Sequence, residues 1–443
     1  MYSLKKGENP LETKSETQRV PHATFTADMI KDYTILVPTM LPRHFKIMIG
    51  IIRSYGYNIE LLENMGDNII RDGLKYVHND TCFPAQLVIG QMIDAIENGK
   101  YDKHKIALMI TQTGGGCRAS NYIHLLRKAL AKAGYEYIPV ISLNVSGLEK
   151  ESAFKLTLPM IHKFVYAMCY GDLLMELVNQ SKPYEIYKGD SERLADKWTE
   201  RLTDEMNKTG ISRRKARKNY DLMIKDFADI PKEKTEKVKV GIVGEIFVKF
   251  SPLGNNNLEQ FLLSEDAEVV VPGLLDFCLF VMYNQLVDKK LYGMHRFSAE
   301  IYRLLYKLFL SIQNDLFRAI KKQGSFRAPM GFEEVPKLAQ GVINLGVKMG
   351  EGWLLTTEMI ELVTEGVDNI VCTQPFGCLP NHVAGKGMMK PIKEKYPQAN
   401  IVAIDYDSGA TKINQENRIK LMLSNARENM QKKTQELNPA SEK

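Results

Sequence analysis

Three cysteines of this sequence occur in loops that are rich in glycine and proline. Cys82 lies in NDTCFP, Cys117 in TGGGCRAS and Cys378 in PFGCLPNH. Each is expected just before a helix or just after a strand, where free N–H groups and the helix dipole lower the pKa of a thiol. Because the thiolate is the form that binds metal, three such side chains predict a soft metal site.

Soft thiolate sites select zinc, copper(I) or an iron–sulfur cluster. Zinc and ferredoxin sites usually contain closely spaced cysteine pairs, whereas these three cysteines are far apart in the sequence. Widely spaced single ligands suit a cluster that is held between domains. A cubane that is bound by only three cysteines leaves one iron position open, and an open position can do chemistry.

The other three cysteines have different surroundings. Cys372 lies close to Cys378 in the sequence but inside a predicted strand. It is therefore expected to be either a buried core residue or a further metal ligand. Cys169 and Cys278 lie in apolar helical segments and are expected to be small buried core residues.

Glycines directly precede two of the loop cysteines. Gly114, Gly115, Gly116 and Gly377 are expected to let backbone N–H groups approach the cofactor closely. The triple glycine does not match the G-x-G-x-x-G pattern of dinucleotide sites and lacks the Lys-Ser/Thr of a phosphate loop. A nucleotide site at this loop is therefore disfavoured.

Two side chains near these loops are candidates for proton transfer. Glu245 follows a predicted strand, where a carboxylate acts as a base, binds an iron or caps the next helix. His382 follows Cys378 closely and either protonates a substrate, hydrogen-bonds a cluster sulfur or caps a helix. Glu351 and Glu358 are candidates of lower weight.

An alternation of strands and helices must position these loops. Strands are expected at 33–38, 58–62, 105–111 and 137–143, and again at 238–244, 267–271, 369–373 and 401–406. Helices between successive strands are typical of a parallel sheet covered on both faces. We therefore predict an α/β fold with two flavodoxin- or Rossmann-like parallel-sheet domains joined by a helical connector, with the cluster between them.

The expected domain boundaries follow from shifts in composition. They are a polar N-terminal lead at 1–30, a first α/β domain at 31–190, a charged helical connector at 191–238, a second α/β domain at 239–426, and a C-terminal helix end and tail at 427–443. The connector contains a basic run at 212–218. This run is either a contact for a nucleotide, phosphate or partner, or a solvated helix face, and the second interpretation is favoured.

Composition excludes several classes of protein. The chain has 443 residues, of which 44% are hydrophobic and 25% charged, so collagen-like, coiled-coil and disordered chains are excluded. The net charge of +6 is spread along the chain, and neither nucleic acid nor a membrane is expected as a partner. No signal peptide or membrane-spanning stretch is evident and six cysteines are few for a disulfide framework, so we expect a cytoplasmic protein.

Five motifs together resemble the 2-hydroxyacyl-CoA dehydratase / benzoyl-CoA reductase superfamily. They are NDTCFPAQLVIGQ, TQTGGGCRASNY, GEIFVKFSPLGNNN, QPFGCLPNHVAGKGM and IDYDSGATKINQENR. The similarity extends from about Thr34 to Ala426. The sequence most resembles the dehydratase-like C-terminal region of acyl-CoA dehydratase activase-related proteins.

The resemblance implies flavodoxin-like domains around a 4Fe-4S cluster held by three cysteines, which by motif are Cys82, Cys117 and Cys378. It implies that an ATP-hydrolysing iron–sulfur activase delivers a low-potential electron, so ATP acts only through this partner. Enzymes of the superfamily are lyases that dehydrate 2-hydroxyacyl-CoA, or oxidoreductases that reduce aromatic acyl-CoA, typically in anaerobic metabolism. A homo-oligomer, most simply a dimer, is also implied.

The activase ATPase motifs are not found before Thr34, so the activase is expected to act in trans. The leading expectation is an iron–sulfur-dependent, low-potential reductase or dehydratase-like enzyme acting on an acyl-CoA or another small molecule. One alternative is a double-cubane cluster protein that reduces small molecules. A second is a non-catalytic iron–sulfur electron-transfer or scaffold protein, and a third is a zinc-stabilised two-domain binding protein.

Overall fold

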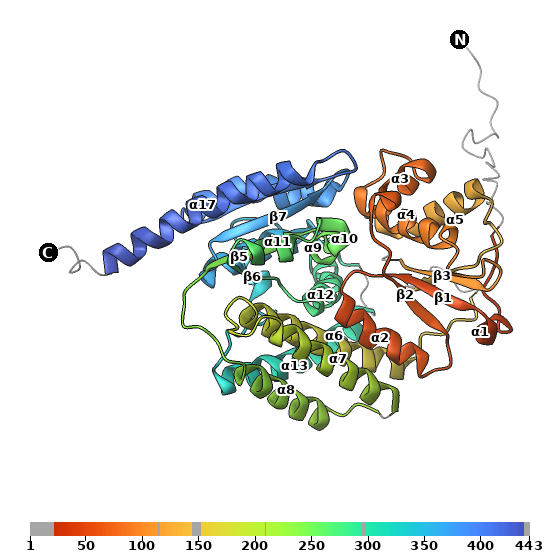
Figure 1. Cartoon of the computed structure of the whole chain (residues 1–443), viewed down its shortest axis with the longest axis horizontal. Coiled ribbons are helices and arrows are strands. Elements are labelled where there is room, and N and C mark those ends of the chain that lie inside the picture. The colour runs from red at the N-terminus through yellow and green to blue at the C-terminus, as the bar shows by residue number, and fades with distance from the viewer. Residues whose placement is uncertain (1–21, 113–115, 144–151, 209, 295–297, 438–443) are drawn as a thin grey trace, which may run out of the picture.

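The computed structural model describes residues 22–112, 116–143, 152–208, 210–294 and 298–437. Within these residues the chain forms two four-stranded sheets, and every strand pairing in both is parallel (Figure 1). The prediction of an α/β fold with two parallel sheets is confirmed.

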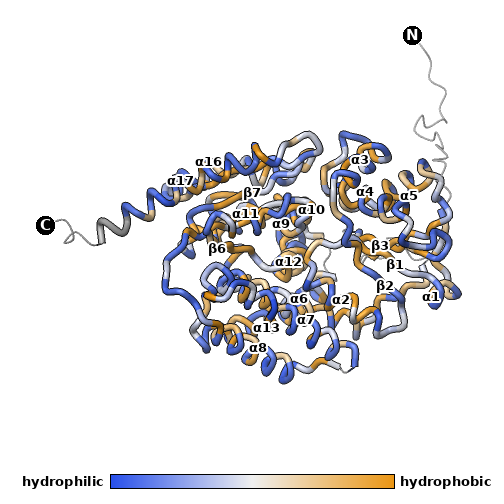
Figure 2. The backbone as a smooth tube through the Cα atoms, viewed as in Figure 1, coloured by the Kyte–Doolittle hydropathy of each residue, from blue (hydrophilic) through white to orange (hydrophobic). Residues whose placement is uncertain are grey.

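The first sheet has the strand order β2-β1-β3-β4. Its strands are β1 (Thr34–Pro38), β2 (Ile59–Leu62), β3 (Ile106–Thr111) and β4 (Val140–Leu143). Ile35 and Met109 pack on the side of α2 (Pro42–Arg53), while Leu36 and Leu108 pack on the side of α4 (Phe83–Glu97) and α5 (Tyr122–Ala133). Because helices cover both faces, the strands are apolar along most of their length, as the hydropathy colours of Figure 2 show.

The second sheet repeats this order as β6-β5-β7-β8. Its strands are β5 (Val238–Gly244), β6 (Ala267–Val270), β7 (Asn369–Pro375) and β8 (Asn400–Tyr406). One face packs on α15 (Trp353–Thr364) through side chains such as Val243 and Ile370. The other face packs on α11 (Leu258–Ser264) and α17 (Lys412–Leu437). The far end of α17 projects beyond the body of the molecule (Figure 1).

A layer of long helices lies beside the two sheets (Figure 1). It consists of α6 (Leu158–Ser181), α7 (Asp190–Lys208), α8 (Arg213–Ala228), α12 (Leu274–Tyr292) and α13 (Ser298–Gln323). The segment expected as a connector, 191–238, is helical, but α7 packs on α2 and α8 packs on α6 and α13. It therefore belongs to this layer, together with helices that we had assigned to both α/β domains.

Short elements complete the chain. They are α1 (Met29–Asp32), α3 (Asp67–Tyr76), η1 (Arg118–Asn121), α9 (Ile246–Phe250), α10 (Pro252–Asn255), α14 (Val335–Leu338), η2 (Asn381–Gly385), η3 (Lys386–Met388) and α16 (Met389–Lys395). The longest of them is α3, which was not predicted from the sequence, and no helix range was predicted for the others either. Its internal Gly73 weakens the helix signal but lets α3 approach α4, because a Cβ there would lie 2.4 Å from the carbonyl oxygen of Gln86.

None of the helices in the described ranges is both long enough and apolar enough to cross a membrane.

Candidate functional site

The three loop cysteines lie where strands end and helices begin, as predicted. Cys82 is the N-cap of α4, Cys117 precedes η1, and Cys378 lies in the turn after β7. Open parallel sheets bind ligands beyond the carboxyl ends of their strands, next to the point where the strand order reverses. Cys117 and Cys378 follow β3 and β7, the third strand of each sheet, and so occupy this position in both.

The loops of Cys82 and Cys378 are in direct backbone contact. The N–H of Phe83 donates to the carbonyl oxygen of Phe376, at an N···O distance of 3.0 Å. Gly377 has a φ of +72°, and a Cβ at this residue would lie 3.1 Å from the Cα of Cys82. The close approach of the two loops therefore depends on glycine at position 377.

A third segment, which carries the predicted candidate Glu351, joins the loop of Cys117 to the loop of Cys378. A Cβ on Gly350 would lie 3.0 Å from Cγ of Pro380 and 3.9 Å from Sγ of Cys117. Gly350 has a φ of +60°. A Cβ on Gly116 would lie 2.4 Å from Sδ of Met349. All three cysteine loops thus meet between the two sheets.

Burial dominates the ionisation of the three thiols. Cys82 and Cys378 are 5% and 6% exposed, and Cys117 is half-buried. Burial raises the pKa of Cys117 to about 11, although the backbone N–H of Ala119 lowers it in part. Burial also raises the pKa values of Cys82 and Cys378. The expectation of lowered thiol pKa values is therefore wrong for the unbound side chains.

Tyr122 contacts one of the three thiols directly. Its hydroxyl lies 3.0 Å from Sγ of Cys82, and this hydrogen bond offsets part of the rise in the thiol pKa that burial causes. Burial raises the pKa of Tyr122 well above its ordinary value, so the phenol keeps its proton and can donate to the sulfur. This partner was also not identified from the sequence.

Two carboxyl groups lie next to the thiols. Oε2 of Glu245 accepts a hydrogen bond of 2.9 Å from the N–H of Val248, so Glu245 caps α9, which was one of its predicted roles. Oε1 of Glu351 accepts one of 3.0 Å from the N–H of Ile246. Burial, together with the charge of Glu351, raises the pKa of Glu245 to about 8, and burial raises the pKa of Glu351. Both carboxyl groups therefore bind a proton more readily than a free glutamate does, and their charges raise the thiol pKa values of Cys117 and Cys378 further, as the charge of Glu245 does for Cys82.

Glu358 has a different partner. Its Oε1 lies 2.9 Å from Nζ of Lys249 in a pair that is almost fully buried. The side chain of Glu358 thus forms a buried ion pair with Lys249 and does not contribute to the cysteine loops.

Among the described residues, no hydrogen bond joins the side chain of His382 or Cys372 to any of the three thiols. The imidazole of His382 is exposed on η2 and has no hydrogen-bond partner among the described residues, while its backbone N–H donates to the carbonyl oxygen of Cys378. Cys372 is fully buried, its Sγ lies 3.7 Å from Oδ1 of Asn381, and burial raises the pKa of its thiol to about 12. These surroundings favour the core role that was open for Cys372.

The predicted glycines divide into two groups. Gly116 and Gly377 lie in the meeting loops, where each permits a close contact. Gly114 and Gly115 lie outside the described residues. Within the described ranges, no group of three or more His, Cys, Asp or Glu side chains is arranged to hold a single metal ion.

No model of a known protein family matches this chain, and no curated protein matches its sequence significantly. The resemblance to the dehydratase superfamily therefore rests on the five sequence motifs, and the cofactor and activity stay predictions.

Proposed function

We propose that Cys82, Cys117 and Cys378 hold an iron–sulfur cluster between the two sheets. The observation that carries this proposal is the meeting of three cysteine loops from both halves of the chain. These residues fit such a cluster. They provide three thiols, the backbone of the loops approaches the thiols closely, and the site is buried, which shields a sulfur-rich group from water. A 4Fe-4S cluster supplies single electrons at low potential when it is bound.

The protein is then an iron–sulfur-dependent reductase or a dehydratase-like enzyme. The charges of Glu245 and Glu351 act on the thiols, and a carboxyl group whose pKa is raised by burial suits a proton donor or acceptor for a bound substrate. The hydroxyl of Tyr122 orients and stabilises the sulfur of Cys82. A substrate such as an acyl-CoA thioester or another small molecule would be bound close to these groups.

An electron donor must approach this site from outside, and the surface near Cys378 suits contact with a protein. Four large apolar side chains are 52–72% exposed in the segments that meet there, and they are Met349, Phe376, Leu379 and Val383. Exposed apolar patches of this kind mark interaction sites. The partner that we propose is an ATP-hydrolysing iron–sulfur activase acting in trans, on a dimeric, cytoplasmic protein.

The ligand assignment is tested by Cys117→Ser in protein purified without oxygen. We expect about four irons and four sulfides per wild-type chain and a loss of most of both in the variant, with loss of the visible absorbance. Cys278→Ser is the matched control, because Cys278 is a half-buried thiol that packs against Met168 away from the loops.

Other metal contents distinguish the alternatives. About eight irons per chain would favour a double-cubane protein that reduces small molecules. Bound zinc, no metal, or an unchanged spectrum in Cys117→Ser would contradict the proposal. A protein whose cluster can be reduced but which turns over no substrate would favour the electron-transfer or scaffold alternative.

A further inference from the structure

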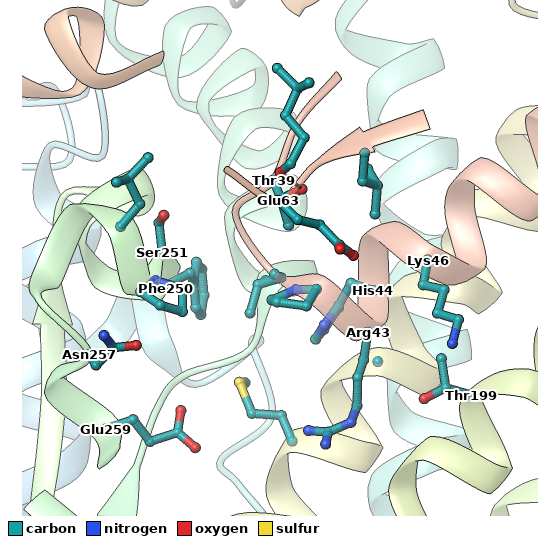
Figure 3. A pocket seen from close by; sticks show the side chains of 18 of the residues that line it. Thr39, Arg43, His44, Lys46, Glu63, Thr199, Phe250, Ser251, Asn257 and Glu259 are labelled. Atoms are coloured by element: carbon teal, nitrogen blue, oxygen red, sulfur yellow. Dashed lines mark hydrogen bonds between the residues drawn. The ribbon is translucent and has the colours of Figure 1, made fainter. Parts of the chain in front are cut away.

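A cleft of about 740 Å³ lies on another side of the junction between the first sheet, the second sheet and the helical layer. Thr39 and Glu63, which follow β1 and β2, line one wall, and Phe250 and Glu259, from α9 and α11, line the opposite wall (Figure 3). None of the three loop cysteines lines it. A volume of this size is typical of small-molecule sites.

The five Lys and Arg side chains of the cleft are already engaged. Arg43 pairs with two acidic side chains of α7, and Arg53 donates to the carbonyl oxygen of Ile59 at 2.7 Å. The remaining pairs are Lys46 with Glu200 at 3.9 Å, Lys100 with Glu60 at 3.5 Å and Lys249 with Glu358 at 2.9 Å. An anionic ligand would have to compete with these partners.

Two hydrogen-bond acceptors that line the cleft, by contrast, have no partner among the described residues. The side-chain carboxylates of Glu63 and Glu259 form no hydrogen bond or ion pair with any residue that the structure describes, although both residues line the cleft. Burial raises the pKa of Glu259, and the charges of Lys182 and Arg43 offset this only in part, because Glu192 pairs with both cations. The two carboxylates lie on opposite walls (Figure 3).

A buried amide gives an independent indication of a missing donor. Gln91 lines the cleft and is only 2% exposed. Its Nε2 donates to the carbonyl oxygen of Asn64 at 3.1 Å, but its Oε1 is buried without a hydrogen-bond partner. Leaving a buried acceptor unpaired costs about 1–3 kcal/mol, so such a group in a cleft indicates a ligand that donates to it.

One lining donor is also unpaired. Nε of Arg43 is buried without a partner, so the ligand carries at least one oxygen acceptor as well as its donors. Apolar side chains between the polar groups, such as Met175 and Phe250, provide contact for a short carbon chain. The leftover groups together therefore match a compact amine.

We propose that this cleft is a second ligand site, which binds a small organic ammonium compound through Glu259, Glu63 and the side-chain oxygen of Gln91. The site is independent of the cluster proposed above. A ligand held in this way contacts both sheet halves and the helical layer, so it stabilises their arrangement.

The proposal is tested by titration calorimetry and thermal unfolding of the full-length protein with ethanolamine and 4-amino-1-butanol, which both carry an ammonium group and a hydroxyl oxygen. We expect a Kd in the millimolar range or tighter and a higher Tm. Ethylene glycol, which has similar size and no charge, should bind more weakly than ethanolamine. Glu259→Gln should weaken amine binding about fivefold or more, since it removes one charge and keeps the shape.

Glu63→Gln is the second variant, because Glu63 is exposed and its substitution should not disturb folding. Glu394→Gln is the matched control, since Glu394 is 65% exposed on α16 and lines no part of this cleft. Cys117→Ser should leave amine binding unchanged, which separates this proposal from the cluster. No binding of either amine, equal binding by wild type and both cleft variants, or preferential binding of inorganic phosphate would overturn the proposal.

Discussion

Gly377 determines how closely the loop of Cys378 approaches Cys82. Replacing it with alanine places a side chain at φ +72° and a Cβ 3.1 Å from the Cα of Cys82. The left-handed backbone alone costs about 1–2 kcal/mol. We therefore expect Gly377→Ala to lower the free energy of unfolding by more than this amount and to reduce iron content, as measured by urea denaturation and iron analysis.

Gly366→Ala separates the two effects. Gly366 has a similar φ of +81°, but nothing lies within 4 Å of a Cβ at this position. Gly366→Ala should lower the free energy of unfolding by the cost of the left-handed backbone alone, and it should leave the iron content unchanged. Equal iron content in the two glycine variants would argue that the contact with Cys82 does not matter for the site.

Sequence patterns predict which side chains of this site lie at strand and helix ends, but not their surroundings. Cys82, Cys117 and Cys378 were all identified because local glycines and prolines interrupt apolar runs. Glu351 was a candidate of lower weight and the contacts of Gly350 were not predicted, because the roles of both arise from contacts between segments distant in the sequence. The error in the thiol pKa values has the same origin, since burial depends on the tertiary structure.

The pairing of α8 with α13 depends on a buried carboxylate. Asp315 on α13 accepts hydrogen bonds from Arg213 and Arg217, and its side chain is only 2% exposed. Both arginines come from the basic run at 212–218 and are about half exposed, so part of this run binds a neighbouring helix. We expect Asp315→Asn to lower the free energy of unfolding by about 1–2 kcal/mol at neutral pH, measured by urea denaturation.

The same pair makes stability depend on pH. Burial alone would raise the pKa of Asp315, but the hydrogen bonds from Arg213 and Arg217 outweigh burial and lower it. A carboxyl with a lowered folded-state pKa stabilises the protein above its unfolded value of about 3.9, and this contribution is lost as the pH falls through the folded value. The difference between wild type and Asp315→Asn should therefore shrink below about pH 4. A constant difference at all acidic pH values would refute this explanation.

Element types are more predictable here than element assemblies. The strands of both sheets appear close to their expected ranges, because buried parallel strands form apolar runs between helices. The helical layer was not predicted as a unit, since the apolar residues of a helix indicate that it is buried but not which other helices it packs against. The helix α3 was not predicted because its close packing on α4 requires a glycine at position 73, and glycine is a poor helix former.

Asp172 connects the main parts of the molecule. Its carboxylate on α6 accepts from Nε2 of His44 on α2 at 2.9 Å and from the N–H groups of Leu274 and Leu275 at 2.8 and 3.0 Å. The carboxylate of Asp172 thus connects α2, which covers the first sheet, to the start of α12. We expect Asp172→Asn to lower the free energy of unfolding by about 2–4 kcal/mol, because an amide nitrogen cannot accept from these donors.

Hydrogen exchange would locate the effect. Faster exchange of the first amides of α12 is expected in Asp172→Asn, with little change in α5. Asp221→Asn, an exposed position on α8, is the control and should leave both helices unchanged. Wild-type exchange at Leu274 and Leu275 in the Asp172 variant would contradict the assignment of Asp172 as their cap.

The meeting of the cysteine loops has a consequence for the order of events during synthesis. Cys82 and Cys117 are synthesised well before Cys378, which lies in the turn after β7. The loop of Cys378 is itself held by β8, since the N–H of Phe376 donates to the carbonyl oxygen of Tyr406 at 2.8 Å. A group bound by all three thiols would therefore be loaded only after β8 has been synthesised, and Cys82 and Cys117 would have to stay reduced until then.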